Sequence, residues 1–444
     1  MLMKTKKNET QHKNSLEIYL ELYRQIENET NHQIEQFGLL LSQRISKKEE
    51  YTEKLTQLEK KGALIRNNKK SVISNGKISS ACKACQTGKG SYTSFISLKC
   101  HRDCYFCFNK NQDEYSFYSH QLKNAYHELI EMYHNNVHLT HIALTGGEPL
   151  LHPKETVQFF SVANEKFPTS HTRLYTTGDL LTRQLLEDLQ SVNLDEIRFS
   201  IKLEDSKQKQ KHILSQIALA VQYIPEVMVE MPVIPGTEEG MKQLLLDLDE
   251  IEIFGINLLE FCFPFHNAES FEEKGLVLKN PPYDVYYNFW YAGGLAIDES
   301  EAICLELIDF AMEQQLQMGV HYCSLENKFT GQIYQQNHDA NLDEMYSFST
   351  RDYYFKTAKA FDRDMKKVIK AMNQFNFPYL INEEYQYVQF PIEAIPYLKN
   401  KNLDFLISFN VVENRNGEQA IREVYLEKTN SNCYLNSETL DVVN

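Results

Sequence analysis

The sequence predicts an α/β protein whose main unit is a parallel sheet, arranged as an open sheet or a partial barrel. Between residues 92 and 263, six strand-like runs alternate with five helical segments, which is typical of βαβ units. In residues 196–202, apolar and polar side chains alternate strictly. A strand inside a doubly wound sheet is apolar on both faces. The polar face therefore favours a barrel whose interior holds something polar.

Bulk properties exclude several classes of protein. The 444 residues include 61 acidic and 46 basic side chains, for a net charge of -15, and a general phosphate-backbone binder needs a basic surface. Residues 1–13 contain no apolar signal-peptide core, and no later segment approaches the length of a membrane span. We therefore expect a cytoplasmic protein with no nucleic-acid or membrane partner. In that compartment the nine cysteines favour metal ligands, reactive thiols or core residues over structural disulfides.

The N-terminal part, residues 1–80, reads as a helical arm and a linker. Apolar side chains recur at three- and four-residue steps from Leu16 onward, and Ser15 can cap the helix, so we expect helix over 15–62. Its apolar face either packs on the main domain or docks a partner or substrate. Residues 66–80 are rich in Asn, Lys, Ser and Gly, which predicts a linker.

The central part, residues 81–335, contains the alternating pattern. In the last strand, Glu260 and Cys262 share a face that we expect to point into the barrel, with Leu259 and Phe261 opposite. The expected strands are 92–98, 138–145, 171–177, 195–201, 227–234 and 255–263, and the expected helices are 118–134, 153–166, 182–190, 205–222 and 239–250.

Residues 336–444 read as a small α+β domain. A loop-rich stretch (264–292) and a helix (298–318) precede it. Within it we expect a helix over 355–375 and a hairpin over 403–428, because apolar residues alternate there and Asn416-Gly417 is a hairpin-turn signal.

Three cysteines gather in one short segment, Cys100, Cys104 and Cys107. Spacings of three and two residues allow their sulfurs to face one centre. Three thiolates are one short of the four that a cuboidal iron-sulfur cluster or a structural zinc ion usually takes. The alternatives are a metal site with an open position and a zinc site completed by His101 or a distant cysteine.

A second motif follows the second expected strand, Gly146-Gly147-Glu148-Pro149. Paired glycines let the backbone approach a ligand, the carboxylate can accept from an ammonium group, and the proline stiffens the turn. Strand ends are also where barrels bind ligands. Such a run also occurs in ordinary tight turns. It indicates a ligand-binding site here because the three cysteines lie one βα unit earlier.

Together these motifs resemble those of the radical SAM superfamily: the three cysteines match its cluster motif, Phe106 its aromatic position, and Gly146 to Pro149 its methionine-amine motif. The resemblance covers residues 92 to 263 and implies a partial (β/α)6 TIM-like barrel. It also implies a [4Fe-4S] cluster whose open iron chelates S-adenosylmethionine. An electron from that cluster then yields methionine and a 5'-deoxyadenosyl radical that abstracts hydrogen from substrate.

The resemblance implies further cofactor contacts. Thr176 and Thr177 match positions that meet the ribose, and Ser200 and Lys202 match positions that meet the ribose or carboxylate. Ile234 lies in a stretch similar to the one that packs on adenine. The alternative for each is a strand-end group satisfied by its neighbours. Arg198, on the polar face, is a further candidate either for binding a carboxylate or for pairing with an internal carboxyl group.

A second thiol group is less defined. Cys82 and Cys85 form a Cys-x-x-Cys pair, and Cys323 is the first choice to complete an auxiliary site, ahead of Cys262, Cys304 or Cys433. We expect a second iron-sulfur cluster; zinc or simple core thiols are the alternatives. This combination looks like a group of radical SAM proteins loosely labelled relatives of glycyl-radical-enzyme activases.

The predicted function is hydrogen abstraction from a peptide or protein, because both appendages offer docking surface. The alternatives are a small-molecule substrate, activation of a glycyl-radical enzyme, and a non-catalytic metal-binding scaffold. The resemblance implies a flavodoxin- or ferredoxin-type electron donor. Cys262 is a candidate to return a hydrogen atom, against the alternative of a core cysteine.

Overall fold

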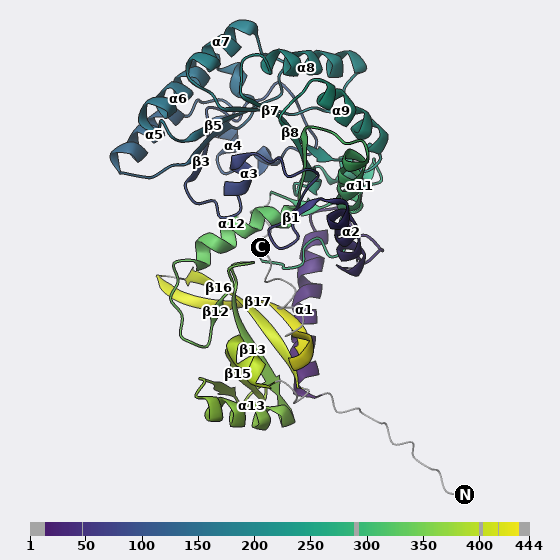
Figure 1. Cartoon of the computed structure of the whole chain (residues 1–444), viewed down its shortest axis with the longest axis vertical. Helices are drawn as coiled ribbons and strands as arrows, with labels where there is room; N and C mark the ends of the chain where they lie inside the picture. The colour runs from purple at the N-terminus through teal and green to yellow at the C-terminus, as the bar shows by residue number, and fades with distance from the viewer. Residues whose placement is uncertain (1–13, 47, 288–292, 399–402, 416, 435–444) are drawn as a thin grey trace, which may run out of the picture. The chain divides into compact units, whose positions relative to one another are not determined.

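The computed structural model describes residues 14–46, 48–287, 293–398, 403–415 and 417–434 (Figure 1). They divide into two compact units. The barrel unit contains the described residues of 34–284 and 288–335, and the C-terminal unit contains those of 1–33, 285–287 and 336–444.

The barrel unit is organised by one nine-stranded sheet. Its middle is parallel and follows the chain in order, because each strand is joined to the next by a helix. These strands are β3 (Ser91–Phe95), β4 (His141–Thr145), β5 (His171–Thr176), β6 (Glu196–Phe199), β7 (Glu226–Val233) and β8 (Gly255–Glu260). β11 (Gly319–Cys323) extends the parallel set beyond β8. The six-stranded parallel sheet predicted from the sequence is confirmed.

Helices cover the outer face of this sheet, as Figure 1 shows for α5 to α9. Ile197, Val229 and Leu258 point to that side and belong to the main hydrophobic core. Polar residues alternate with them and face inward, so the polar inner face is confirmed, although its members differ in part from those expected. The covering helices are α5 (Ala125–His134), α6 (Pro153–Lys166), α7 (Arg183–Ser191), α8 (Lys207–Ala220), α9 (Glu238–Glu250) and α11 (Ser300–Glu313).

One residue expected inside the barrel lies on the other face. Glu260 has the same parity as Ile256 and Leu258, and its carboxylate accepts from Lys279 and from the Leu325 backbone. Asn257 is the inward polar residue of β8, since its amide binds Glu230. The prediction failed because it grouped Glu260 with Cys262, whereas Cys262 belongs to a separate strand and alternation within β8 groups Glu260 with Ile256 and Leu258.

The N-terminal segment differs from the single helix expected. The structure has α1 (Ser15–Glu35) and α2 (Lys48–Lys61), and the chain turns between them at Gly38, whose φ of +102° favours glycine. α2 packs on the barrel unit through Leu55 and Leu58. The expected linker contains two strands, β1 (Leu64–Arg66) and β2 (Ser71–Ile73), which pair with each other, and β2 also pairs with β11.

The C-terminal unit is an antiparallel sheet in the order β14-β15-β13-β16-β17. The predicted hairpin is confirmed as β16 (Asp404–Arg415) and β17 (Glu418–Asn430); Asn416 of its turn lies outside the described residues. The helix expected over 355–375 is wrong in its first third. β13 (Phe355–Phe361) precedes α13 (Asp362–Phe375), because pairing with β15 and β16 outweighs local helix preference. The other strands are β14 (Leu380–Asn382) and β15 (Tyr387–Phe390), with β12 (Ser347–Phe348) beside β13.

α1 belongs to this unit through a buried polar group. The hydroxyls of Tyr19 and Tyr23 both donate to Glu423 at 2.7 Å. Lys359 also pairs with Glu423, so one carboxylate joins the helix, β13 and β17.

The remaining elements are α3 (Ser80–Ala84), α4 (Tyr115–Tyr118), β9 (Cys262–Phe263), α10 (Ala268–Glu272), β10 (Leu295–Ala296) and α12 (Leu325–Asn337), with short 3-10 helices at Phe108–Asn111, Pro149–Leu151 and Ile392–Leu398. None of the described helices has the length and apolar character that spanning a membrane requires.

Candidate functional site

Backbone hydrogen bonds connect the Gly146-to-Pro149 motif to the start of the cysteine segment. The Gly147 amide donates to the carbonyl of Ser97 at 3.0 Å, and the Glu148 amide donates to the carbonyl of Lys99 at 2.9 Å. A Cβ on Gly147 would stand 2.0 Å from the Lys99 carbonyl oxygen, and one on Gly146 would stand 2.6 Å from that of Ser97. Only glycine permits this approach. The strand end after β4 therefore holds the start of the cysteine segment.

The cysteine segment folds back on itself. The Arg102 amide donates to the Cys100 sulfur at 3.4 Å, and the Cys107 amide donates to the carbonyl of Cys104 at 3.1 Å. Burial raises the pKa of Cys100 and of Cys107. That these three thiols bind one metal centre stays a prediction.

The ligands around these sulfurs bear on the alternative of a zinc site. His101, the alternative fourth ligand, is engaged with Asp179 at 2.7 Å. Three thiols without a fourth protein ligand are the set expected for an iron-sulfur cluster with one open iron. The assignment of such a cluster to Cys100, Cys104 and Cys107 stays a prediction.

Arg102 anchors the cysteine segment to the barrel. Its side chain is only 3% exposed, and it donates to both oxygens of Asp179 at 2.5 and 2.7 Å and to Asp205 at 2.6 Å. The two aspartates follow β5 and β6. Sequence reasoning missed this contact, because no local pattern assigns partners 77 and 103 residues away.

Asp179 makes the anchor dependent on pH. Burial opposes ionisation, but hydrogen bonds from Arg102 and His101 outweigh it and hold the pKa of Asp179 well below its usual range. A depressed pKa stabilises the fold above the ordinary aspartate value of about 3.9, and this stabilisation is lost as the pH falls toward the folded-state pKa.

Replacing Asp179 with asparagine should therefore lower the free energy of unfolding by up to about 3 kcal/mol at pH 7, because Arg102 loses a buried partner. Urea unfolding of the wild type and of Asp179→Asn should show this difference at pH 7 and a smaller one below about pH 4. A difference that is the same at both pH values would contradict the assignment.

Glu148 joins two strand ends. Its carboxylate accepts from the Thr176 hydroxyl at 2.7 Å, from the Leu150 amide at 3.0 Å, and from both the amide and hydroxyl of Thr177 at 2.7 Å. Four donors use the lone pairs of both oxygens. The predicted contacts of Thr176 and Thr177 with a ribose, and of Glu148 with an ammonium group, stay predictions. Pro149 is buried and begins the short 3-10 helix that follows.

Four predicted cofactor-binding residues meet in one small pocket. Phe106, from the cysteine segment, and Ser200 and Lys202, which follow β6, line it together with Ile234, which follows β7. The other lining residues, which sequence reasoning missed, are Ile201, Leu203, Glu204, Met231, Pro232 and Thr237. The pocket therefore lies between the cysteine segment and the ends of β6 and β7. Phe106 also packs edge-on against Phe261 at the end of β8.

The second thiol group lies on the inner face of the barrel unit. Cys82 of α3 accepts from Arg198 at 3.3 Å, and Cys323 ends β11. Cys262 lies in β9, where its sulfur is 2.9 Å from the position of a Cβ on Gly294. Burial raises the pKa of Cys262, and its role in returning a hydrogen atom stays a prediction.

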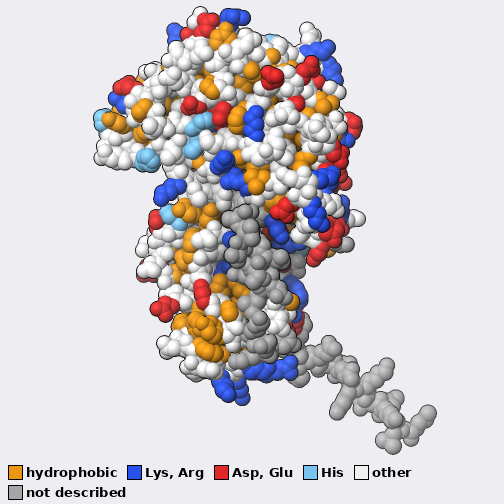
Figure 2. Space-filling model, in the orientation of Figure 1, with side chains coloured by type: hydrophobic (Ala, Val, Ile, Leu, Met, Phe, Trp, Pro, Cys, Tyr) orange, Lys and Arg blue, Asp and Glu red, His pale blue; other side chains and the backbone are white. Residues whose placement is uncertain are grey.

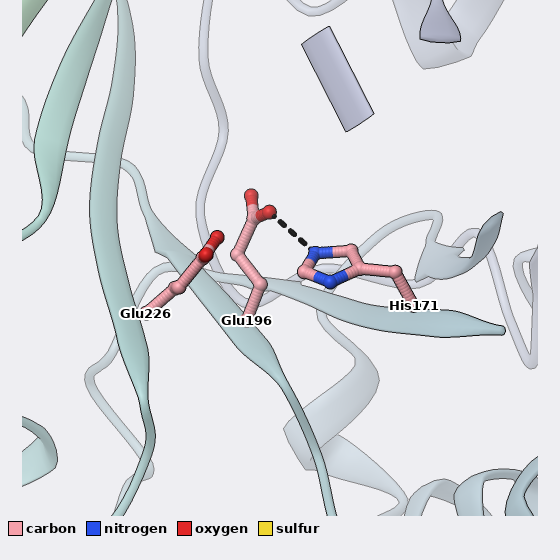
Figure 3. A group of neighbouring side chains, drawn as sticks. All are labelled: His171, Glu196 and Glu226. Atoms are coloured by element: carbon pink, nitrogen blue, oxygen red, sulfur yellow. Dashed lines mark hydrogen bonds and ion pairs between the residues drawn. The ribbon is translucent and has the colours of Figure 1, made fainter. Parts of the chain in front are cut away.

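A further group was missed by sequence reasoning and is shown in Figure 3. His171, Glu196 and Glu226 begin β5, β6 and β7, and their ligand atoms all lie within 4.8 Å of one another. Both oxygens of Glu196 are already used, because one accepts from His171 and Ser79 and the other from Arg198. The group therefore orders the amino-terminal edge of the sheet.

Comparison with known proteins identifies the superfamily that the middle of the chain matches. Residues 94–248 match the Radical SAM superfamily. They are a radical SAM domain, and the resemblance predicted from the cysteine and Gly-Gly-Glu-Pro motifs is confirmed at the level of that superfamily.

A Methanocaldococcus jannaschii protein named as a glycyl-radical enzyme activating enzyme is 30% identical over 212 residues, which are 46% of this chain and 56% of that protein. Among solved structures, Streptococcus suis SuiB bound to S-adenosylmethionine is 13% identical with a TM-score of 0.37, over 68% of this chain and 59% of SuiB. TsrM from Kitasatospora setae, a radical S-adenosylmethionine methyltransferase, is 13% identical with a TM-score of 0.32, over 53% of this chain and 50% of TsrM. The chain thus spans little more than half the length of these proteins.

Proposed function

We propose that this chain is a radical SAM enzyme that reductively cleaves S-adenosylmethionine and activates a carbon-hydrogen bond of a peptide or protein. When bound, a [4Fe-4S] cluster supplies the electron that splits the sulfonium into methionine and a 5'-deoxyadenosyl radical. The observation that supports this most is the backbone connection between the three-thiol segment and Gly146 to Glu148, with a pocket adjoining it.

Each group of residues at the site has a separate role in binding the cluster or the cofactor. Cys100, Cys104 and Cys107 hold the cluster and leave one iron without a protein thiolate. Phe106 and Ile234 supply apolar walls for an adenine, while Ser200 and Lys202 offer polar groups to a ribose or carboxylate. Thr176, Thr177 and Glu148 keep the strand ends in register, so the pocket is formed before the cofactor arrives.

The choice of a peptide or protein substrate rests on the C-terminal unit. β14 is an edge strand, and Leu380 and Ile381 on it are 51% and 46% exposed. Extended peptides add to such edges through backbone hydrogen bonds. The name of the M. jannaschii relative favours a second candidate, activation of a glycyl-radical enzyme, in which the substrate is also a protein. A small-molecule substrate and a non-catalytic scaffold are the remaining alternatives.

A flavodoxin- or ferredoxin-type protein is the proposed electron donor. A second iron-sulfur cluster at Cys82, Cys85 and Cys323 is also part of the proposal and is argued in the next section.

The cleavage step is tested with anaerobically reconstituted protein, dithionite and S-adenosylmethionine. We expect 5'-deoxyadenosine and methionine to form in equal amounts, measured by liquid chromatography and mass spectrometry. Protein that holds its full iron and sulfide but releases neither product, even with candidate peptides, would support the scaffold instead.

A further inference from the structure

We propose that Cys82, Cys85 and Cys323 bind a second iron-sulfur cluster inside the barrel unit, and that Arg198 and Asn257 donate hydrogen bonds to the Cys82 sulfur. The proposal concerns a site separate from the radical SAM motif and does not depend on S-adenosylmethionine cleavage.

The three thiols come together from separate parts of the chain. Cys82 and Cys85 lie on α3 and at its end, and the Cys82 sulfur is 3.3 Å from the Asn257 amide of β8. β11 is the neighbour of β8, and Cys323 is paired in register with Leu259, two residues after Asn257. A Cβ on Gly331 of α12 would stand 2.9 Å from the Cys85 carbonyl oxygen, and Asn327 of the same helix donates to the Cys323 sulfur at 3.2 Å. α3 and the end of β11 therefore face one region.

Donors point at these sulfurs. Arg198 and Asn257 each donate to Cys82 at 3.3 Å, and Asn327 donates to Cys323 at 3.2 Å. Hydrogen bonds to a charged acceptor are about twice as strong as those between neutral groups, so this arrangement suits a thiolate better than a thiol. In iron-sulfur proteins, hydrogen bonds to the ligating sulfurs help to set the reduction potential.

Arg198 is fixed in place by its other contacts. Its side chain is 3% exposed and pairs with Glu196 of its own strand and Glu230 of β7. Glu230 in turn accepts from Asn257 at 2.7 Å. These contacts continue to His321 of β11, whose Nδ1 lies 2.8 Å from the side-chain Oδ1 of Asn257. A network across β6, β7, β8 and β11 thus holds both donors against Cys82.

The number and type of the ligands indicate the class of metal site. Cysteine thiolates are the usual ligands of iron-sulfur clusters, and zinc is the alternative that the measurement of iron and sulfide below distinguishes. Cys304 is buried in the apolar core at α11, so it is not a fourth ligand. The arrangement fits a cluster held by three cysteines.

The test uses the full chain with Cys100, Cys104 and Cys107 all changed to alanine, which removes the first cluster. After anaerobic reconstitution we expect this variant to retain iron and sulfide, with the visible absorption of an iron-sulfur cluster. Adding Cys323→Ala should remove both, while adding Cys433→Ala, at an exposed position, should change neither. Folded triple variant, checked by circular dichroism, that binds no iron and sulfide, or binds zinc alone, would overturn the proposal.

A second measurement tests the donors. In the same triple-cysteine background, Asn257→Ala should shift the cluster's reduction potential to a more negative value, because a hydrogen bond to sulfur stabilises the reduced form. An unchanged potential would overturn the assignment of Asn257. Because the readouts are metal content and potential, failure here is distinguishable from failure of the proposed catalytic function.

Discussion

Changing Cys104 to alanine is expected to reduce 5'-deoxyadenosine formation to the level measured without protein. Cys104 is the middle thiol of the cysteine segment, and its loss leaves two thiolates where the cluster needs three. The protein should still fold, because the segment is also held by Arg102 and by the backbone of Gly147 and Glu148. The measurement is 5'-deoxyadenosine by chromatography under reducing conditions, together with iron and sulfide content.

The matched control for Cys104→Ala is Cys433→Ala. Cys433 is exposed and its sulfur accepts only from Asn430 in the same turn, at 3.3 Å, among the contacts found for it. Product formation at the wild-type rate is expected for the control. If Cys104→Ala formed product at a comparable rate, the cysteine segment would not hold the reactive cluster.

The second large effect is expected for Gly147→Ala. The new Cβ would stand 2.0 Å from the Lys99 carbonyl oxygen and 2.4 Å from its carbon, both of them backbone atoms that cannot rotate away. The cysteine segment must then separate from the end of β4. We expect loss of S-adenosylmethionine cleavage and a destabilisation of at least about 1–3 kcal/mol, the usual cost of overpacking.

Gly240→Ala is the control for that substitution. Gly240 lies within α9, and the nearest atom to its Cβ would be a methyl group of Leu203 at 3.3 Å. Alanine in place of glycine inside a helix is neutral or stabilising by up to about 1 kcal/mol. Equal activity of Gly147→Ala and Gly240→Ala would show that the connection between the motifs does not matter for the reaction.

Much of the fold was predictable because its pattern is local. Each βα unit between β4 and β8 shows an apolar run followed by a helical period, and α6 was placed at its observed bounds, Pro153–Lys166. The errors occurred where distant pairing decides. β1, β2 and β13 are short or contain lysine, and they become strands through their neighbours β11, β15 and β16.

The candidate site was predictable where the residue types and their spacing within one short segment indicate the function. The cysteine spacing and Gly146-Gly147 point to their function without reference to the rest of the chain. The pocket residues Phe106, Ser200, Lys202 and Ile234 followed only from the resemblance to a family.

The supporting contacts could not be predicted. Arg102 donates to Asp179 and Asp205, and Asn257 donates to Cys82, which lies 175 residues away in the sequence. These residues contact each other only because the fold brings distant parts of the chain together. A sequence read alone contains no signal for such pairs. The inner face of β8 was also assigned to the wrong polar residue, since Glu260 shares its face with the buried Ile256 and Leu258.

The central claim is that three thiolates leave one iron open for S-adenosylmethionine. Electron paramagnetic resonance of the dithionite-reduced protein tests it most directly, in a variant with Cys82, Cys85 and Cys323 changed to alanine so that the first cluster alone gives the signal. We predict that adding S-adenosylmethionine shifts the g-values of that signal, because the cofactor binds the open iron. A reduced cluster whose signal is identical with and without saturating S-adenosylmethionine would contradict the account.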